Sequence, residues 1–116
     1  MFDSSTCFKL PNGSNCSPDV SWIKLERWNQ LTPQQREKIP PIAPDFVLEL
    51  MSPSDTLKDV QKKMEEYIDG GVKLAWLIDK KNRRVEIYRQ GKEVEILDSP
   101  TNLSGEDILP GFVLDI

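Results

Sequence analysis

The sequence predicts an α/β fold, and three observations support this prediction. Residues 44–51 form an apolar strand pattern that runs directly into a helix-start signal. A helix is predicted to begin near residues 52–55 and to run to residues 70–71, because apolar side chains in 57–68 have the spacing of an amphipathic helix. Residues 72–79, 84–89 and 93–97 then alternate with short turns, which predicts an antiparallel meander in the C-terminal part of the chain, with 84–89 as a half-exposed strand.

Length and composition favour one globular domain. The chain has 116 residues, of which 38% are hydrophobic and 29% are charged. It contains neither an apolar run of about 18 residues nor the basic start and apolar core of a signal peptide, so we expect no membrane contact and a cytoplasmic location. The net charge of −4 argues against strong nonspecific binding of nucleic acid, which depends on neutralisation of phosphates by Lys and Arg.

The residue inventory restricts the possible chemistry. The chain has no histidine, which excludes Ser-His-Asp and Cys-His catalysis and zinc sites built from histidine. Any metal would be bound through oxygen, which narrows the choice to a hard ion such as Mg²⁺ or Mn²⁺. Cys7 and Cys16 flank a turn and are expected to be free thiols, with a disulfide across the hairpin as the alternative.

The N-terminal part of the sequence predicts a hairpin followed by a segment that leaves the sheet. A strand ends at residues 7–10, Asn12-Gly13 forms a tight turn, and residues 17–23 form the return strand. Asp19, Ser21 and Ile23 share one face of that strand, and Asp19 is either a functional acid or a turn acid at the strand entry. Residues 25–43 then leave the sheet and include a short helix that begins with the capping box 32–35 and runs to about Lys38.

Glu49 is the least expected residue of the apolar strand at 44–51. Strand side chains alternate, so Asp45, Val47, Glu49 and Met51 share one face. An ionised carboxylate at position 49 needs a cation or hydrogen-bond donors, which makes Glu49 a candidate site residue. Asp45 lies about 13 Å away along an extended strand, so a second ligand for the same ion must come from another segment.

Two basic features have open interpretations. On the helical wheel Lys63 lies closest to the buried edge, whereas Lys62 points to solvent, so Lys63 is either a boundary lysine or a partner of Glu49. Residues 80–84 contain a second group of positive charges. These cations either protect a sheet edge at a hairpin tip or contact phosphates.

Several segments together resemble the bacterial putative restriction endonuclease family with the PD-(D/E)XK nuclease fold. They are 17–21 (SPDVS), 44–54 (PDFVLELMSPS), 63–67 (KMEEY), 76–79 (WLID), 103–106 (LSGE) and 109–112 (LPGF). Each motif is weak by itself, but their order and spacing are specific. The resemblance covers nearly the whole chain.

The resemblance implies a restriction-endonuclease-like fold, with a mixed central sheet flanked by helices, and hydrolysis of phosphodiester bonds in DNA with Mg²⁺ or Mn²⁺. It implies that Asp19, Glu49 and the backbone carbonyl of Leu50 hold the metal. The lysine that ordinarily follows the glutamate by two residues is replaced here by Met51, and the resemblance assigns its role to Lys63 on the following helix.

Members of this family typically carry a further N-terminal region, and the present chain resembles a truncated member. An edge of the sheet left open by the missing region predicts a homodimer or another homo-oligomer. The alternative to a nuclease is therefore a catalytically silent interaction module with the same fold.

Overall fold

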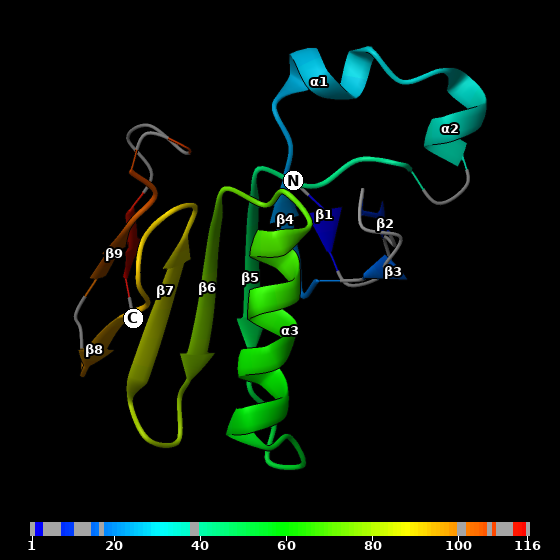
Figure 1. Ribbon diagram of the computed structural model, residues 1–116. Helices are drawn as coiled ribbons and strands as arrows, with labels where there is room; N and C mark the ends of the chain where they lie inside the picture. Colours follow the sequence, from blue (N-terminus) through cyan, green and yellow to red (C-terminus); the bar gives the residue numbers. More distant parts are fainter. Residues whose placement is uncertain are drawn as a thin grey trace.

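A mixed sheet of six strands forms the centre of the molecule (Figure 1). The computed structural model describes residues 2–3, 8–10, 15–16, 18–37, 40–99, 102–106, 108 and 113–115. In spatial order, the strands are β1 (Phe2–Asp3), β4 (Val20–Trp22), β5 (Phe46–Leu50), β6 (Leu74–Asp79), β7 (Arg84–Arg89) and β8 (Glu95–Asp98). Strands β5 and β6 are parallel and the other neighbours are antiparallel, which confirms the α/β class and the C-terminal meander.

The predicted N-terminal hairpin is wrong in its second strand. The short strand β2 (Phe8–Lys9) pairs with β3 (Asn15–Cys16). Val20–Trp22 instead pairs with β1 and β5 in the central sheet. The prediction paired the two strand-like segments that lie nearest to each other across the turn. The segment Val20–Trp22 instead pairs with strands that lie farther away in the sequence. The Asn12-Gly13 turn and Cys7 lie outside the described residues.

The helix α3 (Leu57–Asp69) connects β5 to β6 and covers one face of the sheet (Figure 1). Its apolar stripe is confirmed, because Val60, Met64 and Tyr67 are buried in the core on this face. The helix begins at Leu57, later than predicted, because Thr56 caps it by accepting the N–H of Asp59. The preceding segment forms a separate turn, in which Asp55 accepts the backbone N–H of Ser52.

The opposite face of the sheet is covered by the chain's C-terminal part. The strands β9 (Asn102–Ser104) and β10 (Val113–Asp115) form an antiparallel pair, and Leu103 and Leu114 pack against the core on this side. Strand β7 is therefore covered on both faces and four of its six residues are buried, so the prediction of a half-exposed strand is wrong. The local pattern of β7 could not reveal the distant segments that cover it.

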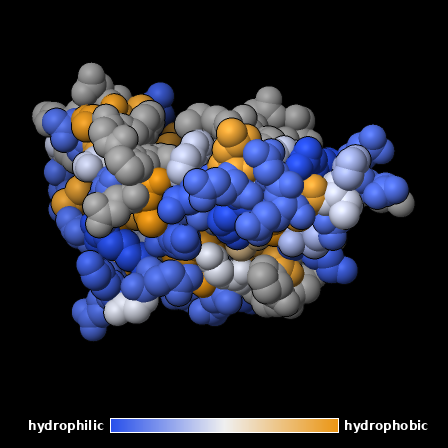
Figure 2. Space-filling model, turned by 90° about the horizontal axis from the view of Figure 1, so that it is seen from above, coloured by the Kyte–Doolittle hydropathy of each residue, from blue (hydrophilic) through white to orange (hydrophobic). Residues whose placement is uncertain are grey.

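Two short helices lie in the segment that connects β4 to β5. They are α1 (Leu25–Asn29), which the sequence did not predict, and α2 (Pro33–Glu37). The capping box is confirmed, because Thr32 and Gln35 bind each other's backbone N–H through their side-chain oxygens. Figure 2 views the end of the molecule from which these helices project, where hydrophilic residues predominate and hydrophobic ones form separate patches. In the described part of the chain, no helix combines the length and apolarity needed to cross a membrane.

Candidate active site

The pairing of β4 with β5 brings Asp19 next to Glu49. Val20 pairs with Leu48 in antiparallel register, so the preceding residue, Asp19, falls opposite Glu49. Side chains at opposite positions of adjacent strands point to the same face of a sheet. One Asp19 oxygen, Oδ2, accepts the backbone N–H of Leu50 at 2.8 Å. Asp19, Glu49 and the backbone of Leu50 therefore lie together, as the sequence-based hypothesis requires.

The side chain of Glu49 is buried beneath α3 and is bound by two residues of that helix. The hydroxyl of Tyr67 donates to Glu49 Oε1 at 2.6 Å. The ammonium of Lys63 lies 3.1 Å from the same oxygen, and the Glu49 side chain is only 8% exposed. These contacts supply the cation and the donor that a buried carboxylate requires.

The environment of Glu49 raises the pKa of its carboxyl group. Burial is the largest cause, because it disfavours the charged form. The hydrogen bond from Tyr67 and the charge of Lys63 oppose this shift, whereas the negative charge of Asp19 adds to it. The influence of Asp19 agrees with its place opposite Glu49.

Lys63 reaches Glu49 from the boundary of the helix. Its side chain is 44% exposed, yet its ammonium lies against the buried carboxylate of Glu49. The ammonium also lies 5.9 Å from the centre of the Tyr67 ring. Lys62 is exposed on the solvent side of α3, so only Lys63 of this pair reaches the acid.

Asp45 has a different role, although it precedes the same strand. Its buried side chain pairs with Arg27 at 2.9 Å and Lys73 at 3.4 Å and accepts the backbone N–H of Lys24 at 2.9 Å. Its backbone carbonyl accepts the N–H groups of Lys73 and Leu74. Asp45 thus joins the segment after β4 to the starts of β5 and β6, at the end of the sheet opposite Glu49.

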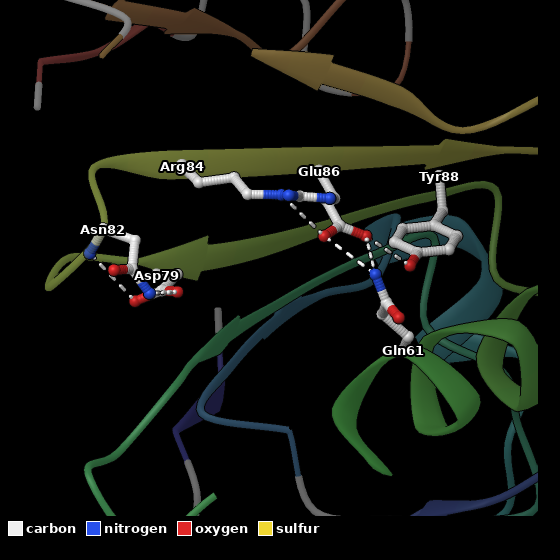
Figure 3. Close-up of polar contacts among 6 residues, drawn as sticks. All are labelled: Gln61, Asp79, Asn82, Arg84, Glu86 and Tyr88. Atoms are coloured by element: carbon white, nitrogen blue, oxygen red, sulfur yellow. Dashed lines mark hydrogen bonds and ion pairs between the residues drawn. The ribbon is translucent and has the colours of Figure 1, made fainter. Parts of the chain in front are cut away.

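Sequence reasoning did not identify Glu86, a further buried acid on the face covered by α3. Glu86 on β7 pairs in register with Leu77 on β6, which in turn pairs with Glu49. Its carboxylate accepts hydrogen bonds from Gln61 of α3 and from Arg84 and Tyr88 of β7 (Figure 3). Four interactions of 2.9 to 3.1 Å occupy the two oxygens, so Glu86 connects α3 to β7. Burial and Glu86 together raise the pKa of Tyr88.

The strand alternation of 84–89 contained the signal for this cluster. Glu86 and Tyr88 share a face, but that pattern is equally typical of a solvated strand. From the sequence, Tyr67 could be assigned only to the apolar stripe of the helix. The acceptor of its hydroxyl group, Glu49, could not be identified without the position of α3 over β5.

The arrangement of Asp19, Glu49 and Leu50 is compatible with the binding of a divalent ion through oxygen ligands. Among the described residues, no hydrogen bond or ion pair occupies Glu49 Oε2 or Asp19 Oδ1. The same part of the chain contains no group of three acidic or cysteine side chains arranged around one metal position. Two carboxylates and one carbonyl suit Mg²⁺, because this ion usually retains several waters.

Comparisons with known proteins agree with this fold. The sequence model of the Uma2 family, described as "Putative restriction endonuclease", matches residues 1–116. A similar solved structure is that of a putative nuclease belonging to DUF820 from Anabaena variabilis ATCC 29413, with a TM-score of 0.79 and 24% identity. The alignment covers 98% of the present chain but only 63% of that protein. No curated protein matches the sequence. The family match over the whole chain shows that this protein belongs to the Uma2 family of putative restriction endonucleases.

Proposed function

We propose that this protein is a metal-dependent endonuclease that hydrolyses phosphodiester bonds of DNA. The observation that carries the proposal is the 3.1 Å contact between the Lys63 ammonium and Glu49, opposite Asp19 on the neighbouring strand. Two acids beside a lysine form the charge pattern that phosphoryl transfer to water requires. The family description and the nuclease fold support the same assignment.

Asp19, Glu49 and the backbone carbonyl of Leu50 would hold Mg²⁺ or Mn²⁺. When bound, the ion supplies positive charge that polarises the scissile phosphate and makes a water molecule more acidic. Tyr67 fixes the orientation of Glu49 through the hydrogen bond to Oε1 and leaves Oε2 open. The N–H of Leu50 orients Asp19 in the same way through Oδ2.

The ammonium of Lys63 has a separate task. Its exposed position at the edge of α3 allows it to approach both Glu49 and a phosphate bound from solvent. There it would offset the negative charge that develops on the phosphate oxygens or orient the attacking water. Lys63 thus takes the role that a lysine at position 51 would have on the strand itself.

The competing hypothesis is a catalytically silent module that assembles into homo-oligomers. That hypothesis explains the contact of Lys63 with Glu49 only as compensation for a buried charge. Tyr67 alone would provide the buried carboxylate with a donor. The Lys63 contact therefore favours the nuclease.

The direct test is cleavage of supercoiled plasmid and short duplex DNA with Mg²⁺ or Mn²⁺. We expect wild-type protein to cleave, and Asp19→Asn, Glu49→Gln and Lys63→Met to lose cleavage by about 100-fold or more. Lys62→Met and Asp69→Asn are matched controls at exposed positions and should retain it. Folded wild-type protein that cleaves neither substrate with either ion would leave the interaction module as the better hypothesis.

A further inference from the structure

The turn between β6 and β7 concentrates positive charge at one end of the sheet. Four of the chain's 15 basic residues lie between positions 80 and 84: Lys80, Lys81, Arg83 and Arg84. Arg84 is bound to Glu86 at 3.1 Å. Lys80, Lys81 and Arg83 are exposed, and none forms an ion pair with any residue that the structure describes.

Protection of a sheet edge does not explain these charges. In the order of the sheet, β6 lies between β5 and β7, and β7 lies between β6 and β8. Both strands that flank the turn are therefore internal. The edge-protection hypothesis for this cluster is wrong, because neither of the strands that flank the turn lies at an edge of the sheet.

The turn has a fixed backbone conformation. Asp79 accepts both the side-chain and the backbone N–H of Asn82, at 2.8 and 3.3 Å (Figure 3). Arg83 has a φ of 51°, a left-handed conformation, and its carbonyl accepts the N–H of Ser99 at the end of β8. A fixed turn backbone sets where the exposed cations start from, so less backbone freedom is lost when they bind a ligand.

The turn lies at the same end of the sheet as Glu49. Strands β5 and β6 are parallel, and the N–H of Met51 binds the carbonyl of Ile78, so both strands end side by side (Figure 1). Glu49 pairs in register with Leu77, and Lys80 lies three residues beyond it, about 10 Å at the rise of an extended strand. One DNA strand carries a phosphate per roughly 3.4 Å of helix axis, so this separation corresponds to about three nucleotides.

A groove separates the turn from the segment that follows β5. Ser52 and Pro53 form one wall, and Lys80, Lys81 and Asn82 form the other. Two acids also line the groove. The carboxylate of Asp55 accepts the N–H of Ser52, and that of Asp79, on the side of the turn, accepts the backbone and side-chain N–H groups of Asn82. The positive wall is therefore the turn, and an anionic ligand would bind on that side.

We propose that Lys80, Lys81 and Arg83 form a binding site for the phosphate backbone of DNA, about three nucleotides from the scissile phosphate. The inference rests on the proposed nuclease function and assigns its substrate contacts. The net charge of −4 argued against binding of nucleic acid. The proposed site removes this difficulty, because its positive charges are concentrated at the position assigned to the DNA backbone.

The test is the salt dependence of DNA binding without divalent ions, measured by fluorescence anisotropy with a labelled duplex and its single strand. Each phosphate contact contributes about 0.9 to the slope of log affinity against log salt on duplex DNA. Lys80→Gln/Lys81→Gln should therefore reduce that slope by about 1.8. Between about 50 and 200 mM salt, the wild-type protein should then lose about tenfold more affinity than the variant.

The matched control is Lys24→Gln/Lys92→Gln, which removes two exposed lysines near the other end of the sheet. This variant should keep the wild-type slope. An unchanged slope in the turn variant, or an equal decrease in both variants, would overturn the proposal, as would wild-type protein without salt-dependent binding. Circular dichroism of each variant verifies folding.

The two proposals can fail separately. Cleavage that is lost in Glu49→Gln but unaffected by the turn variant, with unchanged binding, would retain the nuclease and reject the turn as a DNA site. If DNA binding depends on the turn but the protein does not cleave, the turn is retained as a DNA site and the nuclease is rejected.

Discussion

The Lys63 ammonium on α3 lies 3.1 Å from Glu49 Oε1 on β5, beneath the helix that connects β5 to β6. A side chain two residues after Glu49 would lie on the same strand and face, but that position holds Met51. The crossover returns α3 over the strand that it follows, so a lysine in the second turn of the helix reaches the acid. The contact thus depends on the β5–α3–β6 unit rather than on spacing along one strand.

Replacement of Lys63 by Met should destabilise the metal-free protein near neutral pH. Glu49 would lose its cationic partner and retain the hydrogen bond from Tyr67. The ammonium is 44% exposed, so solvent screening limits the expected loss to about 1 kcal/mol of unfolding free energy. Urea denaturation measures it, with Lys62→Met as the control that should change stability by less than about 0.5 kcal/mol. Equal effects of the two substitutions would show that the ion pair does not contribute to stability.

The contribution of Glu49 to stability should decrease as pH rises. Its pKa in the folded protein is raised above the ordinary value of 4.5, mainly by burial. The folded state therefore binds more protons than the unfolded state between these two pKa values. The stabilisation is fully present below the unfolded pKa and is lost as pH increases through the folded pKa. In EDTA, wild-type protein should lose stability relative to Glu49→Gln over this window, as measured by urea denaturation. A difference that is constant with pH would contradict the raised pKa.

Asp45→Asn should destabilise the fold without loss of metal binding. The substitution leaves Arg27 and Lys73 without their shared, fully buried anion. Because both cations remain partly exposed, we expect a loss of about 2 to 3 kcal/mol. Calorimetry should show that Mn²⁺ binding persists in Asp45→Asn and is lost in Asp19→Asn. The reverse pattern would transfer the metal role to Asp45. Asp69→Asn, an exposed helix position, is the stability control.

Glu86→Gln should destabilise the protein by about 2 kcal/mol, although it preserves the shape of the side chain. The amide group would place donors where Gln61, Tyr88 and Arg84 already donate. Glu93→Gln makes the same chemical change at an exposed position and should have almost no effect. Thermal denaturation of both variants measures the difference. Similar melting temperatures would show that the buried network around Glu86 does not secure α3 on the sheet.

The local pattern of the sequence determined the elements that carry the site. Alternation identified the strand of Glu49 and the face that it shares with Val47, and the structure buries both on the side of α3. Helical spacing separated Lys63 from Lys62, and the ion pair confirms that Lys63 faces the sheet. These properties depend on neighbours within one turn of helix or a few residues of strand, which the sequence displays directly.

The tertiary structure alone decided which distant segments meet. Asp19 lies opposite Glu49 because β4 pairs with β5, whereas sequence proximity favoured pairing across the Asn12-Gly13 turn. The burial of Glu86 and the bond from Tyr67 to Glu49 depend on the height and angle of α3 over the sheet. Strand pairing and helix packing depend on how all apolar faces of the chain are buried together. A local sequence pattern does not show which distant segment will cover a given face.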